Sequence, residues 1–285
     1  MKTALLLLVP MLLATARIFA GPTADSESDK SDYNLFHPTP DSLLRDFDTD
    51  RPDKTNSPHT LDAGRFQLET GIAGYTRTKD SGVRAQNWTW ADTMLRVGLT
   101  SSTELQLEMP FYQTSSDRDL PTDKVDRNSG IGDLTAIIKT NLWGNDSGDT
   151  AGGLELFVTA PTASHNLGSG KVEGGTLLLL GLKLPQEFDL GINSGVNIVV
   201  DGENDYGAEI VNSVSVSHSI VGPLSAYFEL YSAVPSSDTG NWVGTVDVGL
   251  LLMFEKKFQL DAGVNFGVTG GADDLQTFVG ASHRF

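Results

Sequence analysis

The chain has 285 residues, no cysteine, and 20 basic against 37 acidic residues, which gives a formal net charge of −17. Without cysteine it has no disulfides, no thiolate metal sites and no thiol nucleophile. Nucleic-acid binding needs clustered Lys and Arg, so the acidic balance argues against nucleic acid as a partner.

Residues 1–20 have the pattern of a secretory signal peptide. Lys2 precedes an apolar run from Ala4 to Leu13, and small residues follow as far as Ala20. A basic start, a short apolar centre and a small-residue cleavage site mark such peptides. The run is too short for a membrane-spanning helix, which needs about 20 apolar residues. We therefore expect cleavage after Ala20 and export.

Residues 21–63 differ in composition from everything that follows. They are polar, rich in proline and show little alternation, so we expect an irregular N-terminal segment with no strand of its own. Near its end two cations lie among carboxylates, in the run Asp50, Arg51, Pro52, Asp53 and Lys54.

From Gly64 onward the sequence predicts twelve β-strands, each about as long as a tilted strand that crosses hydrocarbon. They span residues 64–78, 88–99, 103–113, 130–142, 152–161, 174–184, 188–201, 207–221, 224–233, 242–254, 258–268 and 275–285. Short turns alternate with longer polar loops such as 79–87 and 114–129, which is typical of outer-membrane barrels. Residues 143–151 are the exception, a fairly long turn on the short side. The even strand count places both termini in the periplasm.

Apolar and polar residues alternate along these strands. Leu105 and Leu107, for example, flank Gln106, and successive strand residues point to opposite faces. A soluble β-sandwich alternates in the same way, but its apolar face looks inward. The strand lengths and the terminal Phe285 favour the membrane alternative. We predict an all-β, transmembrane, antiparallel up-and-down β-barrel of about twelve strands over residues 64–285.

The polar face of the predicted barrel places charged side chains in the lumen. By parity they include Glu69, Arg96, Glu104, Glu108, Asp133, Lys139, Glu229, Asp247 and Asp261. Acids outnumber bases, so an open lumen should favour cations and neutral solutes. The two cations near Pro52 are suited to pair with these acids, and we expect residues 21–63 to plug the lumen. The alternative is a flexible periplasmic tail.

Aromatic residues near the strand ends are typical of the interfacial girdles of membrane barrels. They are Trp88, Trp90, Phe111, Trp143, Trp242 and Phe254. Trp88 and Trp90 share their parity with Arg96, which instead predicts that they face the lumen. There they would form an apolar patch for an aromatic solute, together with the tyrosines Tyr75, Tyr227 and Tyr231.

Four segments resemble one known family. They are TDRPDKT at residues 49–55, GIGDLTAIIK at 130–139, LDAGVNFG at 260–267 and the ending FVGASHRF. They are similar to the transporter family named for the MetA pathway of phenol degradation, and the resemblance covers nearly the whole mature chain. It implies an outer-membrane barrel that passes small molecules, with aromatic hydrocarbons suggested by the family name. His283 departs from the pattern, because a larger aromatic residue is expected there.

The expected function is passive uptake of small, aromatic or hydrophobic molecules through the bacterial outer membrane. One alternative is a non-transporting structural or sensory barrel. Another is a lipid hydrolase that uses His218 and Ser219, but parity places these side chains on opposite faces, where they cannot act as nucleophile and base. Catalytic and phosphate-loop motifs are absent from the sequence, so we expect no enzyme.

We expect no metal and no cofactor. The expected partners are outer-membrane lipid and lipopolysaccharide, the barrel-assembly machinery through the C-terminal strand, and a small solute.

Overall fold

The computed structural model describes residues 29–200, 205–236 and 240–285, so the predicted signal peptide lies outside the described residues. The strands are β1 (Phe66–Asp80), β2 (Val83–Gly98), β3 (Thr103–Asp119), β4 (Val125–Gly130), β5 (Leu134–Trp143), β6 (Thr150–Ala160), β7 (Glu173–Leu184), β8 (Phe188–Val200), β9 (Tyr206–Val221), β10 (Leu224–Pro235), β11 (Val243–Phe254), β12 (Phe258–Gly267) and β13 (Leu275–Arg284). Two 3-10 turns, η1 (Asp41–Leu43) and η2 (Pro185–Glu187), accompany them. In the described ranges, no helix has both the length and the apolar character needed to cross a membrane.

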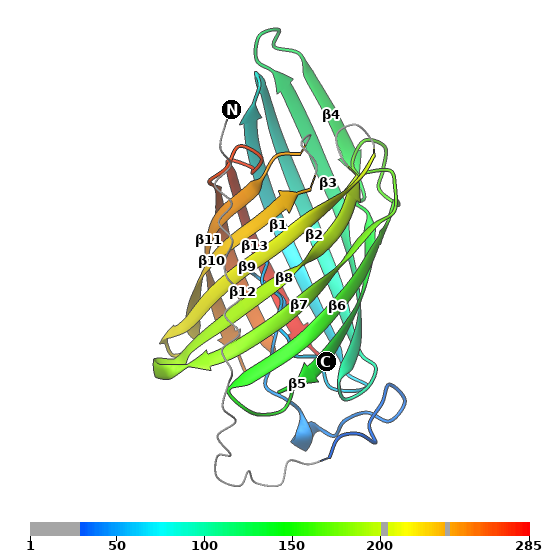
Figure 1. Cartoon of the computed structure of the whole chain (residues 1–285), viewed down its shortest axis with the longest axis vertical. Coiled ribbons are helices and arrows are strands. Elements are labelled where there is room, and N and C mark those ends of the chain that lie inside the picture. The colour runs from blue at the N-terminus through cyan, green and yellow to red at the C-terminus, as the bar shows by residue number, and fades with distance from the viewer. Residues whose placement is uncertain (1–28, 201–204, 237–239) are drawn as a thin grey trace.

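The sheet closes on itself. Consecutive strands pair antiparallel except β4 and β5, which both pair with β3, and β13 returns to pair with β1 (Figure 1). The inner half of β3 pairs with β5 and its outer half with β4. Both pairings keep the same register, so β4 and β5 follow one line that is interrupted at residues 131–133. The prediction of an all-β, antiparallel up-and-down barrel of about twelve strands is confirmed.

The wall has its polar face inside and its apolar face outside. The largest fully buried side chains are all polar: Arg96, Lys139, Gln67, Gln106, Gln259, Glu69, Glu104, Glu155, Glu229, Asn193, Thr39 and Asp62. Large apolar side chains are exposed instead, among them Leu107 at 36%, Phe266 at 47% and Val279 at 45%. A soluble sandwich would show the reverse. A barrel with an outward apolar band is built to span a membrane.

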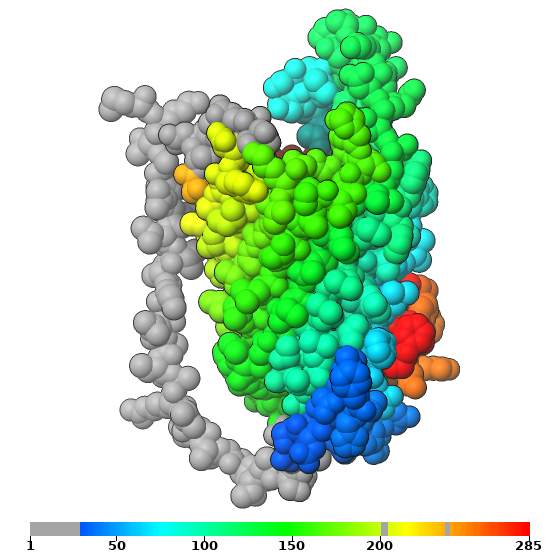
Figure 2. Space-filling model, turned by 90° about the vertical axis from the view of Figure 1, so that its right-hand side faces the viewer, coloured from blue at the N-terminus to red at the C-terminus, as the bar shows by residue number. Residues whose placement is uncertain are grey.

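The ends of β1 to β4 extend beyond the rest of the barrel on one side (Figures 1 and 2). We call residues 75–88 and 114–129, which form the ends of β1 to β4, the outer extension. The prediction that 79–87 and 114–129 are loops is wrong. A two-residue turn joins β1 to β2 and a five-residue turn joins β3 to β4, and almost every residue around them pairs across strands. Because both faces of the outer extension lie beyond the apolar band, neither shows the apolar alternation that marks the other strands.

The inward and outward faces exchange parity where the outer extension begins. β1 pairs with β13 with a register shift between Gly71 and Ala73, so Ile72 is an extra residue of the kind found in a β-bulge. At the same level Ala91 in β2 has a φ of 49°. Below this level odd-numbered residues of β1 such as Glu69 face inward, and above it they face outward.

The parity exchange corrects one prediction. Trp88 pairs with Tyr75, and Trp90 pairs with Ala73, which in turn lies opposite the exposed Val279. Trp88 and Trp90 are 43% and 42% exposed and stack on each other with ring centroids 5.6 Å apart. They face away from the lumen, and the prediction that they face the lumen is wrong.

Candidate functional site: a polar plug across the lumen

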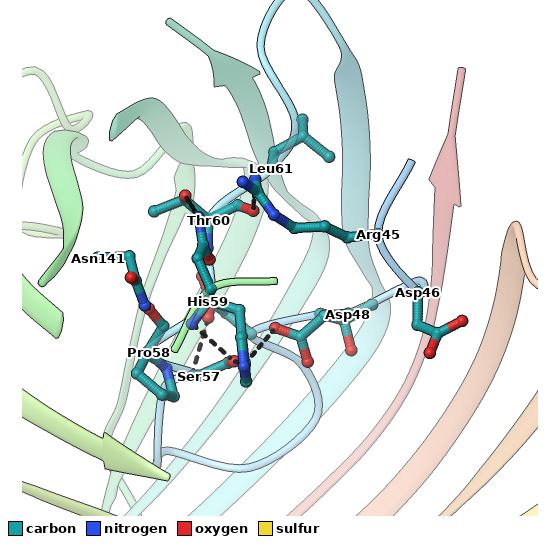
Figure 3. A network of polar contacts seen from close by, with 12 residues as sticks. Arg45, Asp46, Asp48, Ser57, Pro58, His59, Thr60, Leu61 and Asn141 are labelled. Atoms are coloured by element: carbon teal, nitrogen blue, oxygen red, sulfur yellow. Dashed lines mark hydrogen bonds and ion pairs between the residues drawn. The ribbon is translucent and has the colours of Figure 1, made fainter. Parts of the chain in front are cut away.

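Residues 45–63, which we call the plug segment, run through the barrel interior without forming a strand. Figure 3 shows part of this segment, with Pro58 beside the wall residue Asn141. Asn141 donates its side-chain N–H to the carbonyl of Pro58 at 2.9 Å. Two glycines of the wall leave room for the segment. A Cβ at Gly181 would lie 3.0 Å from Pro58 Cγ, and a Cβ at Gly191 would lie 2.9 Å from Thr55 Cγ2.

Asp50 is the centre of the contacts on the side of β2, β3 and β5. Its buried carboxylate accepts hydrogen bonds from Lys139 Nζ at 2.5 and 2.6 Å and from Gln106 Nε2 at 2.7 Å. Arg96 Nη1 lies 3.6 Å away. Burial raises the pKa of Asp50, but the charges of Arg96 and Lys139 outweigh it and hold the pKa below its ordinary value. Lys139 also pairs with Glu155 at 3.1 Å. The plug segment therefore supplies an anion to two wall cations.

Glu69 and Glu104 are bound both by the wall and by the backbone of the plug segment. Arg96 lies between them, with N–O distances of 2.9 Å to each carboxylate. The backbone N–H groups of Asp50 and Arg51 donate to Glu69, and that of Leu61 donates to Glu104 at 2.6 Å. Hydrogen bonds to a carboxylate are among the stronger ones in proteins.

The opposite wall receives the two cations of the plug segment. Arg51 Nη2 lies 2.7 Å from Asp261 Oδ1, and Lys54 Nζ lies 2.7 Å from Asp247 Oδ2. The backbone N–H of Lys54 donates to both oxygens of Glu229 at 3.0 Å. At Gly280 a Cβ would collide with the Arg51 guanidinium, so this glycine makes space for it.

The plug segment is also fastened at its inner end. Arg45 donates to both carboxylate oxygens of Asp146, at 2.9 and 3.0 Å, and Asn145 donates to Thr60. Burial raises the pKa of Asp146, but the hydrogen bonds from Arg45 and Lys30 together lower it by more, so its pKa is below the ordinary value. The turn 144–149 that carries these contacts is the long turn that the sequence showed on the short side.

Two cavities lie on either side of the plug segment. The inner one, of about 480 Å³, is lined by Pro52, Asp53, Tyr227 and the turn 144–149, among others. The other, of about 290 Å³, lies between β2, β3 and β5. It is lined by Asp92, Glu108, Pro110, Gln113, Gly132, Asp133, Thr135 and Leu167. The plug segment lies between these two parts of the lumen.

The predicted site residues fall into two groups. Glu69, Arg96, Glu104, Lys139, Glu229, Asp247 and Asp261 contact the plug segment. Glu108 and Asp133 do not contact it in the described part of the chain and line the second cavity instead. Of the tyrosines, Tyr227 is buried, whereas Tyr75 faces outward beside Trp88. The predicted tyrosine patch is therefore divided between the two faces of the wall.

Three kinds of contact between the plug segment and the wall were not predicted from the sequence. The side-chain amide of Gln106 donates to the Asp50 carboxylate. That of Gln67 donates to the backbone carbonyl of Asp48, and that of Asn56 donates to the Glu155 carboxylate. Their alternation with apolar residues on β1 and β3 was a usable signal for the two glutamines. The Arg45–Asp146 contact joins residues 101 positions apart, and the backbone donors to wall carboxylates have no sequence signal at all.

His218 and Ser219 do not form a catalytic pair in the described structure. His218 stacks on Phe188 with ring centroids 4.2 Å apart, and its Nδ1 lies 3.1 Å from the carbonyl of Glu187. The histidine therefore packs beside the turn η2.

Several solved structures are similar to this chain. An outer membrane channel from Pseudomonas putida F1 is 13% identical, with a TM-score of 0.59 over 82% of this chain and 99% of that one. The NanC porin is 11% identical, with a TM-score of 0.47 over 76% of this chain and 98% of that one. The translocator domain of the autotransporter NalP from Neisseria meningitidis is 14% identical, with a TM-score of 0.47 over 78% and 88%. The first of these shows the fold of an outer-membrane barrel.

No curated protein sequence is significantly similar to this chain. A family model described as "Putative MetA-pathway of phenol degradation" matches residues 49–285, which include most of the plug segment and the whole barrel. The chain therefore belongs to this family.

Proposed function

We propose that this protein is an outer-membrane channel for the passive uptake of small molecules, closed at the centre of its lumen by the plug segment. The observation that carries the proposal is the way the plug segment is held. Its contacts with the wall are side-chain hydrogen bonds and ion pairs to at least six strands, and it joins no strand ladder. A segment held in this way can leave the lumen while the sheet stays intact.

The open channel should favour cations and neutral solutes. When the plug segment leaves, Asp247 and Asp261 lose Lys54 and Arg51. The wall then presents more carboxylates than cations, and rings of Asp and Glu select for cations in pores. We infer in addition that the short turns and both termini face the periplasm, as is usual for such barrels.

The family description supports small aromatic solutes, because it names phenol degradation. Tyr227 and Pro52 give the inner cavity apolar surface beside its polar groups. We place no catalytic role on this chain. Its further expected partners are outer-membrane lipid and the barrel-assembly machinery, which would bind the C-terminal strand β13.

Replacing Arg51 and Lys54 together by alanine tests the channel. We expect the double variant to show a steady, cation-selective conductance in planar bilayers, because the plug segment loses both cation contacts to the acidic wall. The wild type should conduct less and only intermittently. Lys124→Ala with Lys257→Ala, at two exposed turn positions outside the plug contacts, is the matched control and should behave as wild type.

Liposome swelling then compares the rate at which phenol enters with the rates for sugars of increasing size. Faster phenol entry in the double variant supports the aromatic solute class. Equal, near-zero conductance of wild type and double variant would favour the alternative, a non-transporting structural or sensory barrel.

A further inference from the structure

The outer extension separates its charges by face. Its strands carry five basic residues, Arg77, Lys79, Arg84, Arg118 and Arg127, and four acidic ones, Asp80, Asp117, Asp119 and Asp126. Lys79, Arg84 and Arg118 lie directly opposite one another on β1, β2 and β3. Arg77 and Arg127 occupy the parallel row two residues away. Paired residues share a face and alternate residues return to it, so all five cations lie on one face and all four acids on the other. We call the first the basic face.

The basic face looks outward, above the aromatic girdle. Tyr75 and Trp88 form the next row toward the membrane on this same face, with ring centroids 4.9 Å apart. Aromatic girdles lie at the level where hydrocarbon meets head groups. Two strand residues span about 7 Å, so the row of Arg77 begins about 7 Å beyond the aromatic row. The basic face therefore lies at the depth of lipid head groups.

This placement of charge is unfavourable for the protein alone. Like charges directly opposite one another destabilise a strand pair, and Lys79, Arg84 and Arg118 form such a row across three strands. Within the part of the chain that the structure describes, only Arg118 of the five forms an ion pair, with Asp123 at 3.1 Å. The acids of the same strands lie on the opposite face. Four cations are thus left to an external anion, in a protein with a net charge of −17.

We propose that the basic face binds the phosphate groups of lipopolysaccharide in the outer leaflet. Arginine offers a planar fork of N–H donors that matches phosphate, and lysine adds a compact charge. The lipid-facing position, directly above an aromatic girdle, gives access to a phosphate on lipid A whose acyl chains lie against the wall below. The proposal rests on the orientation proposed above, in which the outer extension faces the cell exterior.

The test uses purified full-length protein in detergent micelles and lipid A as the probe, with binding measured by native mass spectrometry and titration. The variant Lys79→Gln, Arg84→Gln, Arg118→Gln removes the central row. We expect it to bind bisphosphorylated lipid A at least about tenfold more weakly, as three basic groups near an anionic lipid head group would predict. A second variant, Arg84→Lys with Arg118→Lys, keeps the charge but removes the planar forks of donors, so it should bind more weakly than the wild type and more tightly than the central-row variant.

The matched control removes three cations elsewhere, with Lys124→Gln, Lys256→Gln and Lys257→Gln, and should leave lipid A binding unchanged. Equal loss in the control, equal binding by the central-row variant, or unchanged binding of dephosphorylated lipid A would each overturn the proposal. Inorganic phosphate that binds as tightly as lipid A would also overturn it, because the acyl chains would then contribute nothing. A difference in gel mobility between unheated and heated samples, as in the wild type, verifies that each variant is folded.

Orientation is tested separately. The chain has no cysteine, so Ser81→Cys at the tip of the β1–β2 hairpin provides a single label site. Labelling by a membrane-impermeant maleimide on intact cells supports the proposed orientation. Labelling only after lysis would overturn both the orientation and the lipopolysaccharide site, whatever the conductance. If the protein does not conduct but still binds lipid A, only the channel proposal is overturned. The experiments therefore distinguish failure of the channel proposal from failure of the lipopolysaccharide site.

Discussion

The inner half of β1, β2 and β3 and the outer extension belong to the same strands but arrange charge in opposite ways. In the inner half Arg96 points into the barrel, between Glu69 and Glu104, and all three are buried. In the outer extension Arg84, on the same strand as Arg96, points outward among other cations. The register shift at Ile72 lies between the two regions.

The difference shows what burial demands. A buried charge without a partner is costly, so the inner half can hold its carboxylates only if cations and N–H groups reach them. The plug segment provides many of these partners. In the outer extension water solvates the charges, so pairing inside the protein is not required there, and one face can remain available to an external anion.

The largest expected effect comes from removing a buried cation of the inner half. Lys139→Met leaves Asp50 and Glu155 without their shared partner in a closed interior. Breaking a buried pair in this way costs about 3–5 kcal/mol. The measurement is urea unfolding of the refolded barrel in lipid vesicles, followed by tryptophan fluorescence.

Arg118→Met in the outer extension is the matched control for this variant. Its partner Asp123 is 77% exposed and Arg118 itself is 47% exposed. Exposed pairs contribute about 0–1 kcal/mol. Equal losses of stability in the two variants would contradict the contrast between the two regions.

A smaller effect is expected where the wall leaves space for the plug segment. A Cβ in Gly280→Ala would collide with the Arg51 guanidinium and move it away from Asp261. We expect a loss of about 1–3 kcal/mol, typical of overpacking, and more frequent channel opening in bilayer recordings. Gly207→Ala, at a strand glycine with open space around it, should change neither quantity. An unchanged frequency of channel opening in Gly280→Ala would show that the contact between Arg51 and Asp261 does not control gating.

Most of the fold was accessible from the sequence because lipid imposes alternation. All twelve predicted strands are present, and most of their ends agree within a few residues, since apolar residues such as Leu107 and Phe266 must face the acyl chains. The strand β4 and the outer ends of β1 to β3 were missed for the same reason. Beyond the membrane neither face of a strand is required to be apolar.

Strand parity predicted the inward direction of the lumen residues correctly only for residues before the register shift at Ile72. Glu69 lies before Ile72 in β1, and its predicted inward direction agrees with its burial. Trp88 lies beyond the level of the shift, and one extra residue in β1 leaves no mark in the sequence pattern. The contacts of the plug segment depend on which strands close the barrel, which the sequence does not specify residue by residue. Its role in gating stays a prediction.

The smallest expected effect is the pH dependence of the inner fastening. Hydrogen bonds from Arg45 and Lys30 hold the pKa of Asp146 below its ordinary value of 3.8. A lowered pKa stabilises the folded state above the unfolded value, and this stabilisation is lost as pH falls through the folded value. Asp146→Asn should therefore lower stability most above pH 4, and this loss should shrink as pH falls below that value. The side chain is partly exposed, so solvent screening limits the loss to about 0.5–1 kcal/mol. Urea unfolding at pH 7 and at pH 2 measures the difference, and an equal effect at both pH values would show that charge at Asp146 does not fasten the plug segment.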